Sequence, residues 1–151
     1  MSEATQQKQS GRRENRIAAM QFLYMFESNR NDNLQDTLAI FFESKEEPRE
    51  FYAFAEELIA GAISHLKEID SAISNSAKNW SLDRIAKVDL AILRLAIFEL
   101  LYRNDIPPVV SINEAIDIAK TFAGAESRRF VNGILDNIKG SLKRPLRTAN
   151  K

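Results

Sequence analysis

The stretch that most constrains the fold is the run from Val88 to Arg103, VDLAILRLAIFELLYR, the most apolar part of the chain. Placed on a helix, its apolar side chains cover nearly the whole circumference, so other elements must pack on most of its sides. The run is shorter than the roughly 20 apolar residues that cross a bilayer, and it contains several charged residues. We therefore expect it to be the buried central helix of a globular domain.

The composition fits a single domain in a reducing compartment. A chain of 151 residues with 44% hydrophobic and 28% charged residues is long enough for one sizeable core. It contains no cysteine, which excludes disulfides, thiol catalysis and thiolate metal sites. Residues 1–9 are polar and contain no signal-peptide core, so we expect a cytoplasmic protein without a membrane anchor.

The charges are unevenly distributed although the formal net charge is zero. Residues 139–151 are basic and contain no acid, and the N-terminal segment is also rich in arginine. The acids are densest in residues 36–70, which contain nine of the 21. This pattern predicts a basic side and an acidic side, and a basic side permits a polyanionic partner.

Helical periodicity runs through the chain and no segment has the alternation of a strand, which predicts an all-α fold of six or seven helices. We expect a flexible tail over 1–10, one helical domain over 11–142 and a basic tail over 143–151. Gly61 interrupts a long helix expected from about residue 49 to the middle seventies, and it marks a close helix crossing. Ser111 and Glu114 form the pattern S-x-x-E of a capping box, which predicts a helix start there.

Catalytic constellations are absent from the sequence. The single histidine, His65, lies on a predicted helix without any convergent set of ligands, so it is interpreted as a surface or satisfied residue. The acidic clusters at 46–50 and 56–57 have the pattern of solvated helix faces. We therefore expect neither an enzyme nor a bound cofactor or metal.

The first helix carries the most informative polar pattern. Arg13, Arg16, Met20 and Tyr24 fall within an arc of roughly 80°, opposite the apolar face, and Arg12 is adjacent. Single-stranded nucleic acid is bound by such a pairing, because arginine neutralises phosphates and unstacked bases lie on aromatic or guanidinium planes. The alternative is a solvated helix start with Tyr24 half-buried in the core.

Several segments resemble the NusB family of bacterial transcription antitermination and termination factors. They are RRENRIAAMQFLYMFE, VDLAILRLAIFEL, DIPPVVSINEAIDIAKTF and RRFVNGILDNI, in this order over about residues 12–138. The resemblance implies two packed three-helix bundles and an RNA-binding protein without catalytic activity. It also implies a pairing with NusE, a small-subunit ribosomal protein, binding of the single-stranded boxA element of nascent RNA, and modification of elongating RNA polymerase on ribosomal RNA operons.

The resemblance also implies which residues contact partners. Those expected to contact RNA lie at the starts of two helices: Arg12, Arg13, Arg16, Tyr24, Glu126, Arg128, Arg129 and Phe130. Those expected to contact the partner protein precede or begin the central helix: Asp83, Lys87 and Asp89. Glu14 and Asn15 interrupt the arginine block, and Ala77 replaces an aromatic of some relatives.

Two other functions are weighed against RNA binding. One is a protein-interaction module or homodimer with little RNA affinity of its own. The other is the NusB-like domain that precedes the catalytic part of ribosomal-RNA cytosine methyltransferases. We expect the latter to be excluded, because only a basic tail follows Leu142.

Overall fold

The computed structural model describes residues 3–149, of which residues 3–10 by their backbone only. Within this range the fold is all-helical and contains no strand, as the periodicity predicts. The elements are α1 (Glu3–Ser28), α2 (Leu34–Glu43), η1 (Arg49–Tyr52), α3 (Ala53–Ser64), α4 (Leu66–Ser76), η2 (Leu82–Arg84), α5 (Lys87–Tyr102), α6 (Pro108–Ala123) and α7 (Ala125–Lys139).

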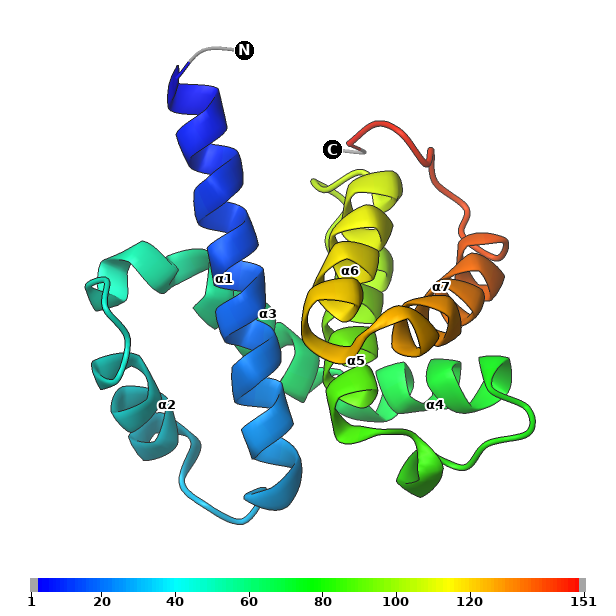
Figure 1. The fold of residues 1–151 in the computed structure, drawn as a ribbon, viewed down its shortest axis with the longest axis horizontal. Coiled ribbons are helices and arrows are strands. Elements are labelled where there is room, and N and C mark those ends of the chain that lie inside the picture. Colours follow the sequence, from blue (N-terminus) through cyan, green and yellow to red (C-terminus); the bar gives the residue numbers. More distant parts are fainter. Residues whose placement is uncertain (1–2, 150–151) are drawn as a thin grey trace.

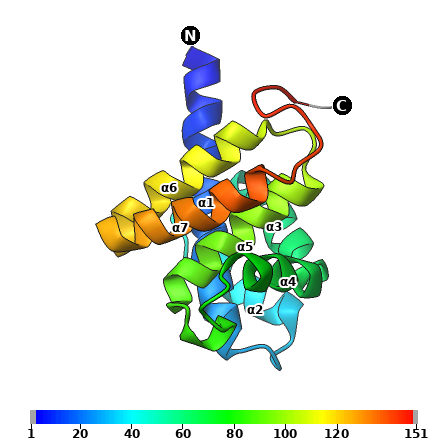
Figure 2. The ribbon, with the colours of Figure 1, turned by 90° about the vertical axis from the view of Figure 1, so that its right-hand side faces the viewer.

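Helix α5 lies at the centre of the molecule, and every residue from Asp89 to Leu100 is buried. Helices α1, α2 and α3 lie on one side of it, and α4, α6 and α7 cover the other (Figure 1). Figure 2 shows α6 and α7 side by side along one flank of α5. The prediction of a buried central helix between two helical bundles is thus confirmed.

The long helix expected after residue 49 is interrupted. His65 has φ −111° and ψ 22°, and this turn separates α3 from α4. The imidazole stacks on the Tyr102 ring of α5, with 3.8 Å between ring centroids. The break changes the direction of the chain, so that α4 packs on α5 and α7 rather than continuing α3.

The interpretation of Gly61 as the mark of a close helix crossing is confirmed. A Cβ atom built at this position would lie 2.0 Å from Cζ of Phe98, so α3 and α5 approach each other more closely than any side chain allows.

The predicted capping box at Ser111 is wrong. Helix α6 begins one turn earlier, with Pro108 in its first turn, where a missing N–H leaves no hydrogen bond unmade. Ser111 is therefore a buried helical residue. Gly124, with φ 96°, then separates α6 from α7 in a conformation that favours glycine.

The start of α1 and the segment that follows α7 lie at the same end of the molecule (Figures 1 and 2). Helix α1 begins at Glu3, whereas the sequence analysis expects the helical domain to begin at Gly11. The flexibility of residues 1–10 stays a prediction, and residues 1–2 lie outside the described range. In the C-terminal segment, Arg144 donates to the carbonyl oxygens of Ile106 at 2.8 Å and Leu100 at 3.0 Å. None of the helices described here has both the length and the apolarity that a bilayer crossing requires.

Candidate nucleic-acid and partner interface

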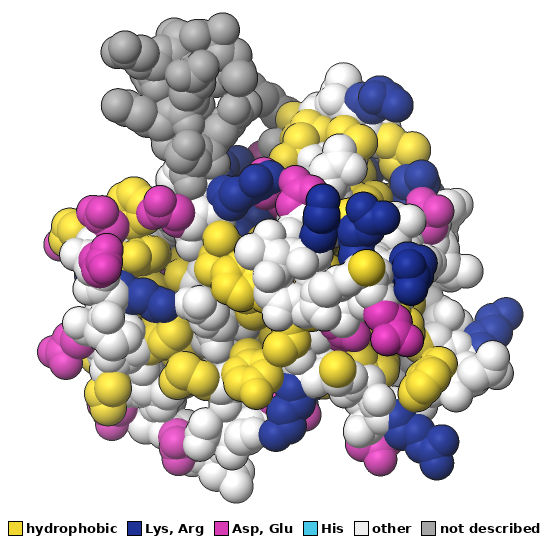
Figure 3. Space-filling model, in the orientation of Figure 1, with side chains coloured by type: hydrophobic (Ala, Val, Ile, Leu, Met, Phe, Trp, Pro, Cys, Tyr) yellow, Lys and Arg dark blue, Asp and Glu magenta, His cyan; other side chains and the backbone are white. Residues whose placement is uncertain are grey.

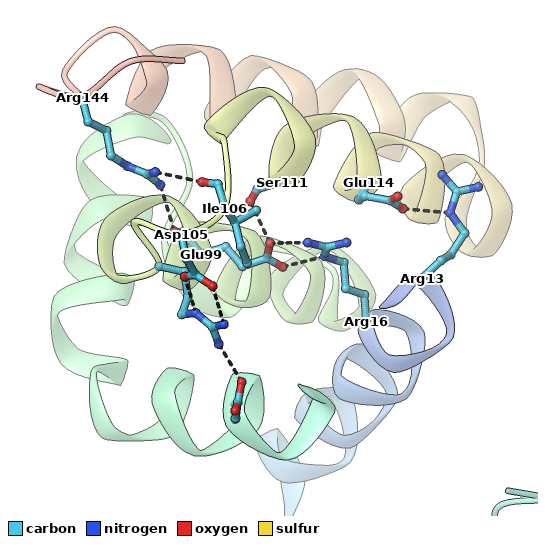
Figure 4. A network of polar contacts seen from close by, with 10 residues as sticks. Arg13, Arg16, Glu99, Asp105, Ile106, Ser111, Glu114 and Arg144 are labelled. Carbon is cyan, nitrogen blue, oxygen red and sulfur yellow. Dashed lines mark hydrogen bonds and ion pairs between the residues drawn. The ribbon is translucent and has the colours of Figure 1, made fainter. Parts of the chain in front are cut away.

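Arg16 lies in the core, where its side chain is only 3% exposed. Its Nε and Nη2 atoms each donate a hydrogen bond of 2.9 Å to the carboxylate of Glu99 on α5 (Figure 4). The expectation that Arg16 lies on the exposed face of α1 is therefore wrong. The physical reason is Glu99, a carboxylate inside the most apolar helix, which requires a cation to compensate its burial.

Glu99 joins three helices through its two oxygens. Besides the bonds from Arg16 of α1, it accepts a hydrogen bond of 2.7 Å from the hydroxyl of Ser111 on α6. All three side chains are buried, so the network fixes the position of α1 relative to α5 and α6. Sequence reasoning missed this role of Glu99, although an acid in the middle of a largely apolar stretch was the available signal.

Arg13 lies at the boundary between α1 and α6. Its Nε donates to Glu114 at 2.8 Å and its Nη2 donates to Asp117 at 2.9 Å, and its side chain is 48% exposed. The hydrogen bond to Glu114 is the main reason that the pKa of Arg13 is raised. Sequence reasoning did not predict either acid as a partner, because they lie about 100 residues further along the chain.

Arg12 lies over the ring of Phe54 on α3, with 4.5 Å from its guanidinium carbon to the ring centroid. It is half-buried and forms no ion pair within residues 11–149. Arg103 approaches the same ring at 5.5 Å, but its guanidinium is held by two hydrogen bonds of 2.9 Å to Asp105. These bonds lower the pKa of Asp105 to about 2. Arg12 therefore forms no ion pair in this cluster among the described side chains, although its charge also contributes to the lowered pKa of Asp105.

The start of α7 adjoins a cleft of about 370 Å³. Glu126, Arg128 and Arg129 are exposed, whereas Phe130 is half-buried. The cleft joins segments that are distant in sequence, and its walls are Trp80, Arg84, Ile85, Ala86, Asp89, Ala123, Glu126, Ser127 and Phe130. The structure thus places the predicted partner residue Asp89 beside the predicted RNA residues Glu126 and Phe130.

Asp89 is buried at this cleft, where its side chain has little compensation. One of its two carboxylate oxygens, Oδ1, is without a hydrogen-bond partner. Burial raises the pKa of Asp89, and a hydrogen bond from Ser127 only partly opposes this effect. Asp83 and Lys87, the other predicted partner residues, are exposed, and Nζ of Lys87 donates to the Ser28 hydroxyl at 2.9 Å.

A second hollow is an apolar groove of about 400 Å³ between α1, α2 and the ends of α5 and α6. Its lining is mostly apolar and consists of Met20, Gln21, Tyr24, Met25, Phe41, Lys45, Val88 and Phe122. Tyr24 and Phe122 are 44% and 45% exposed. Tyr24 follows Arg13 by about three helical turns, roughly 16 Å along α1, so the tyrosine lies in this groove and not beside the arginine.

Figure 3 shows how charged and hydrophobic side chains are distributed on one face of the molecule. Lysine and arginine side chains form a broken band across its upper part, from α1 over α6 toward α7, with acidic side chains between them. Hydrophobic side chains gather below this band, over α1 and its neighbours. Within the described residues, no group of three or more His, Cys, Asp and Glu side chains is placed to hold a metal ion.

The sequence matches the NusB family over residues 13–140. The chain belongs to the NusB family. A transcription antitermination protein NusB from Geobacter sp. (strain M21) is 48% identical over 139 residues, which cover 87% of this chain and 95% of the relative. This NusB-family chain is accordingly a transcription antitermination factor, and all its predicted site residues except Arg12 lie inside the matched range.

Solved structures agree with this assignment. A T. maritima NusB has a TM-score of 0.77 and 37% identity, and the match covers 92% of this chain and 93% of that one. A NusB solved with NusE and double-stranded RNA has a TM-score of 0.77 and 29% identity, with 87% and 98% covered. The NusB fold of this chain is therefore shared with a relative that was solved with both a protein and an RNA.

Proposed function

We propose that this NusB-family protein binds single-stranded boxA-like RNA together with NusE, and that the assembly acts on elongating RNA polymerase on ribosomal RNA operons. The observation that carries the RNA-binding part is the cleft at the start of α7. Two aromatic side chains, Trp80 and Phe130, line it together with Arg84, and Arg128 and Arg129 are exposed on the first turns of the same helix, outside the cleft lining. Aromatic rings and guanidinium groups are the side chains on which unstacked bases and phosphates bind.

Arg12 and Arg13 extend the proposed RNA surface along α1. Arg12 forms no ion pair within residues 11–149, so its charge is available to a phosphate. Arg16, in contrast, is assigned a positioning role, because contact with RNA would require it to leave the buried carboxylate of Glu99. The proposed RNA path thus runs from the start of α1 toward the cleft at α7.

NusE is proposed to bind at the apolar groove and the adjoining start of α5. The groove exposes Tyr24, Met25 and Phe122, a larger apolar surface than scattered surface residues produce. Val88 lies in the lining of the groove. Its neighbours in the sequence, Lys87 and Asp89, are two of the predicted partner residues. A relative was solved together with NusE and double-stranded RNA, which supports the proposal that this chain binds both kinds of partner.

The second candidate function, an interaction module or homodimer with little RNA affinity of its own, is favoured by a specific observation. Of the three arginines at the start of α1, one is buried and one is paired with two acids. This leaves few free cations for a strand bound without NusE.

The test is a salt-dependent titration of a boxA-like single strand, with and without NusE. We expect the affinity to rise when NusE is added, and log affinity to fall with log salt by about 0.7 per neutralised phosphate. Replacing Arg128 and Arg129 with glutamine should reduce that slope by about 1.4. Arg49→Gln is the matched control, because Arg49 is equally exposed but already paired with Glu56.

Two results would contradict the proposal. Unchanged binding by the Arg128 and Arg129 variant would remove the α7 cleft from the RNA surface. The other contradicting result is an absence of RNA binding both with and without NusE. If the measured molecular mass is then that of a dimer of this chain or of its complex with NusE, the interaction module is favoured.

A further inference from the structure

Glu114 and Asp117 of α6 form what we call the clamp on Arg13. This clamp places two negative charges where an RNA-binding protein needs positive charge. Glu114 and Asp117 lie one turn apart on α6 and take up the Nε and Nη2 donors of the Arg13 guanidinium (Figure 4 shows the bond to Glu114). We infer that these two carboxylates compete with RNA phosphate for Arg13 and thereby weaken RNA binding unless a strand makes further contacts. This inference rests on the proposed RNA-binding function.

The charge balance favours competition over simple support of Arg13. One cation with two carboxylates leaves the cluster with a net charge of −1. A phosphate at the free edge of the guanidinium lies about 4 Å from the cation and roughly 7 Å from each acid. Coulomb energy falls as the inverse of distance. The attraction to the cation is therefore proportional to about 1/4 and the two repulsions together to about 2/7, so attraction and repulsion nearly cancel. A clamped Arg13 therefore adds almost nothing to phosphate binding.

The clamp is weak enough to open. Arg13 is 48% exposed and Asp117 is 55% exposed, and ion pairs of such exposure contribute about 0 to 1 kcal/mol. Glu114 is only 19% exposed and is the better anchored of the two acids. A strand that already contacts Arg12 and the α7 cleft can therefore displace the acids, whereas a strand held by α1 alone cannot.

The experiment measures RNA affinity of Asp117→Asn, Glu114→Gln and their combination, as intact proteins with NusE present. Both amides keep the side-chain length and a hydrogen-bond acceptor for Arg13. We expect the combined variant to bind a boxA-like strand about fivefold more tightly, the equivalent of one exposed ion pair. Its slope of log affinity against log salt should steepen by about 0.7, because Arg13 now neutralises a phosphate.

Two controls separate the clamp from a general change of charge. In an Arg13→Gln background the same two substitutions should produce no gain. Asp136→Asn on α7 removes an acid that is 58% exposed and pairs with a cation of the same helix, Lys139, and it should leave the salt slope unchanged. Thermal melts of all variants should agree within a few degrees.

Three results would overturn the inference while the parent still binds RNA. The first is a gain of RNA affinity that persists in the Arg13→Gln background, and the second is an unchanged RNA affinity of the combined variant. The third is a loss of RNA affinity in the combined variant, which would mean that the acids position Arg13 for RNA. A parent that binds no RNA with or without NusE would overturn the proposed function itself, and the inference with it.

Discussion

Arg16→Met tests whether the buried arginine of α1 holds the two bundles together. The substitution removes two hydrogen bonds of 2.9 Å and leaves Glu99, which is 1% exposed, with only the Ser111 hydroxyl. Removing one partner of a buried ion pair costs about 3 to 5 kcal/mol, because the other charge stays buried without compensation. This is a large share of the roughly 5 to 15 kcal/mol that stabilises a domain.

Urea unfolding followed by circular dichroism measures this cost. With a denaturant slope of about 2 kcal/mol per molar urea, the midpoint should fall by roughly 2 M. The double variant Arg16→Met and Glu99→Met should recover most of the loss, because apolar side chains replace the pair without leaving a buried charge. Arg49→Met is the matched control, since that ion pair is exposed and its loss should cost under about 1 kcal/mol.

The reasoning is refuted if Arg16→Met costs under about 1 kcal/mol, or if the two single losses simply add in the double variant. RNA binding by the double variant, at a temperature where it is folded, provides a second readout. We expect its salt slope to equal that of the parent, because Arg16 neutralises no phosphate. A slope lower by about 0.7 would return Arg16 to the RNA surface.

Three further predictions concern stability. Gly61→Ala should destabilise by about 1 to 3 kcal/mol in urea, because its Cβ meets Phe98, whereas Gly133→Ala on open α7 surface should stabilise by about 0.5 to 1 kcal/mol. Burial raises the pKa of Asp89, so the free energy of unfolding falls as pH rises through that pKa. Asp89→Asn should therefore increase the free energy of unfolding by about 1 kcal/mol at pH 7. The same substitution should weaken NusE binding. The pKa of Asp105 is lowered from 3.8 to about 2, so its contribution to the free energy of unfolding is complete above about pH 4 and is lost toward pH 2. Asp105→Asn should remove this dependence on acid pH, which is worth under about 1 kcal/mol at such an exposed site.

The fold could be predicted from the sequence because apolar periodicity carries most of the information about helices. The central run over residues 88–103 agrees with α5, Lys87–Tyr102, to within a residue at each end. The break at His65 was missed, because no proline or turn-forming sequence marks it. The error at Ser111 arose because a short motif cannot reveal that a buried acid elsewhere requires the serine hydroxyl.

The candidate site was only partly predictable, and the three arginines at the start of α1 show why. Positions 12, 13 and 16 were grouped by helical geometry and by the family resemblance, yet their main partners differ: the Phe54 ring, two acids of α6 and the buried Glu99. Those neighbours lie on α3, α6 and α5, whose placement around α1 no local pattern contains.

This division of the arginines also explains how a protein of zero net charge can present the proposed RNA surface. Buried Glu99 neutralises the arginine that packs in the core, and the acids on α6 neutralise the arginine at the bundle boundary. Arg12 on α1 and the arginines at the start of α7 then remain for a strand. In the proposed function, a partner protein that adds contacts beside these cations would compensate for their small number, and RNA binding would then depend on assembly rather than on charge alone.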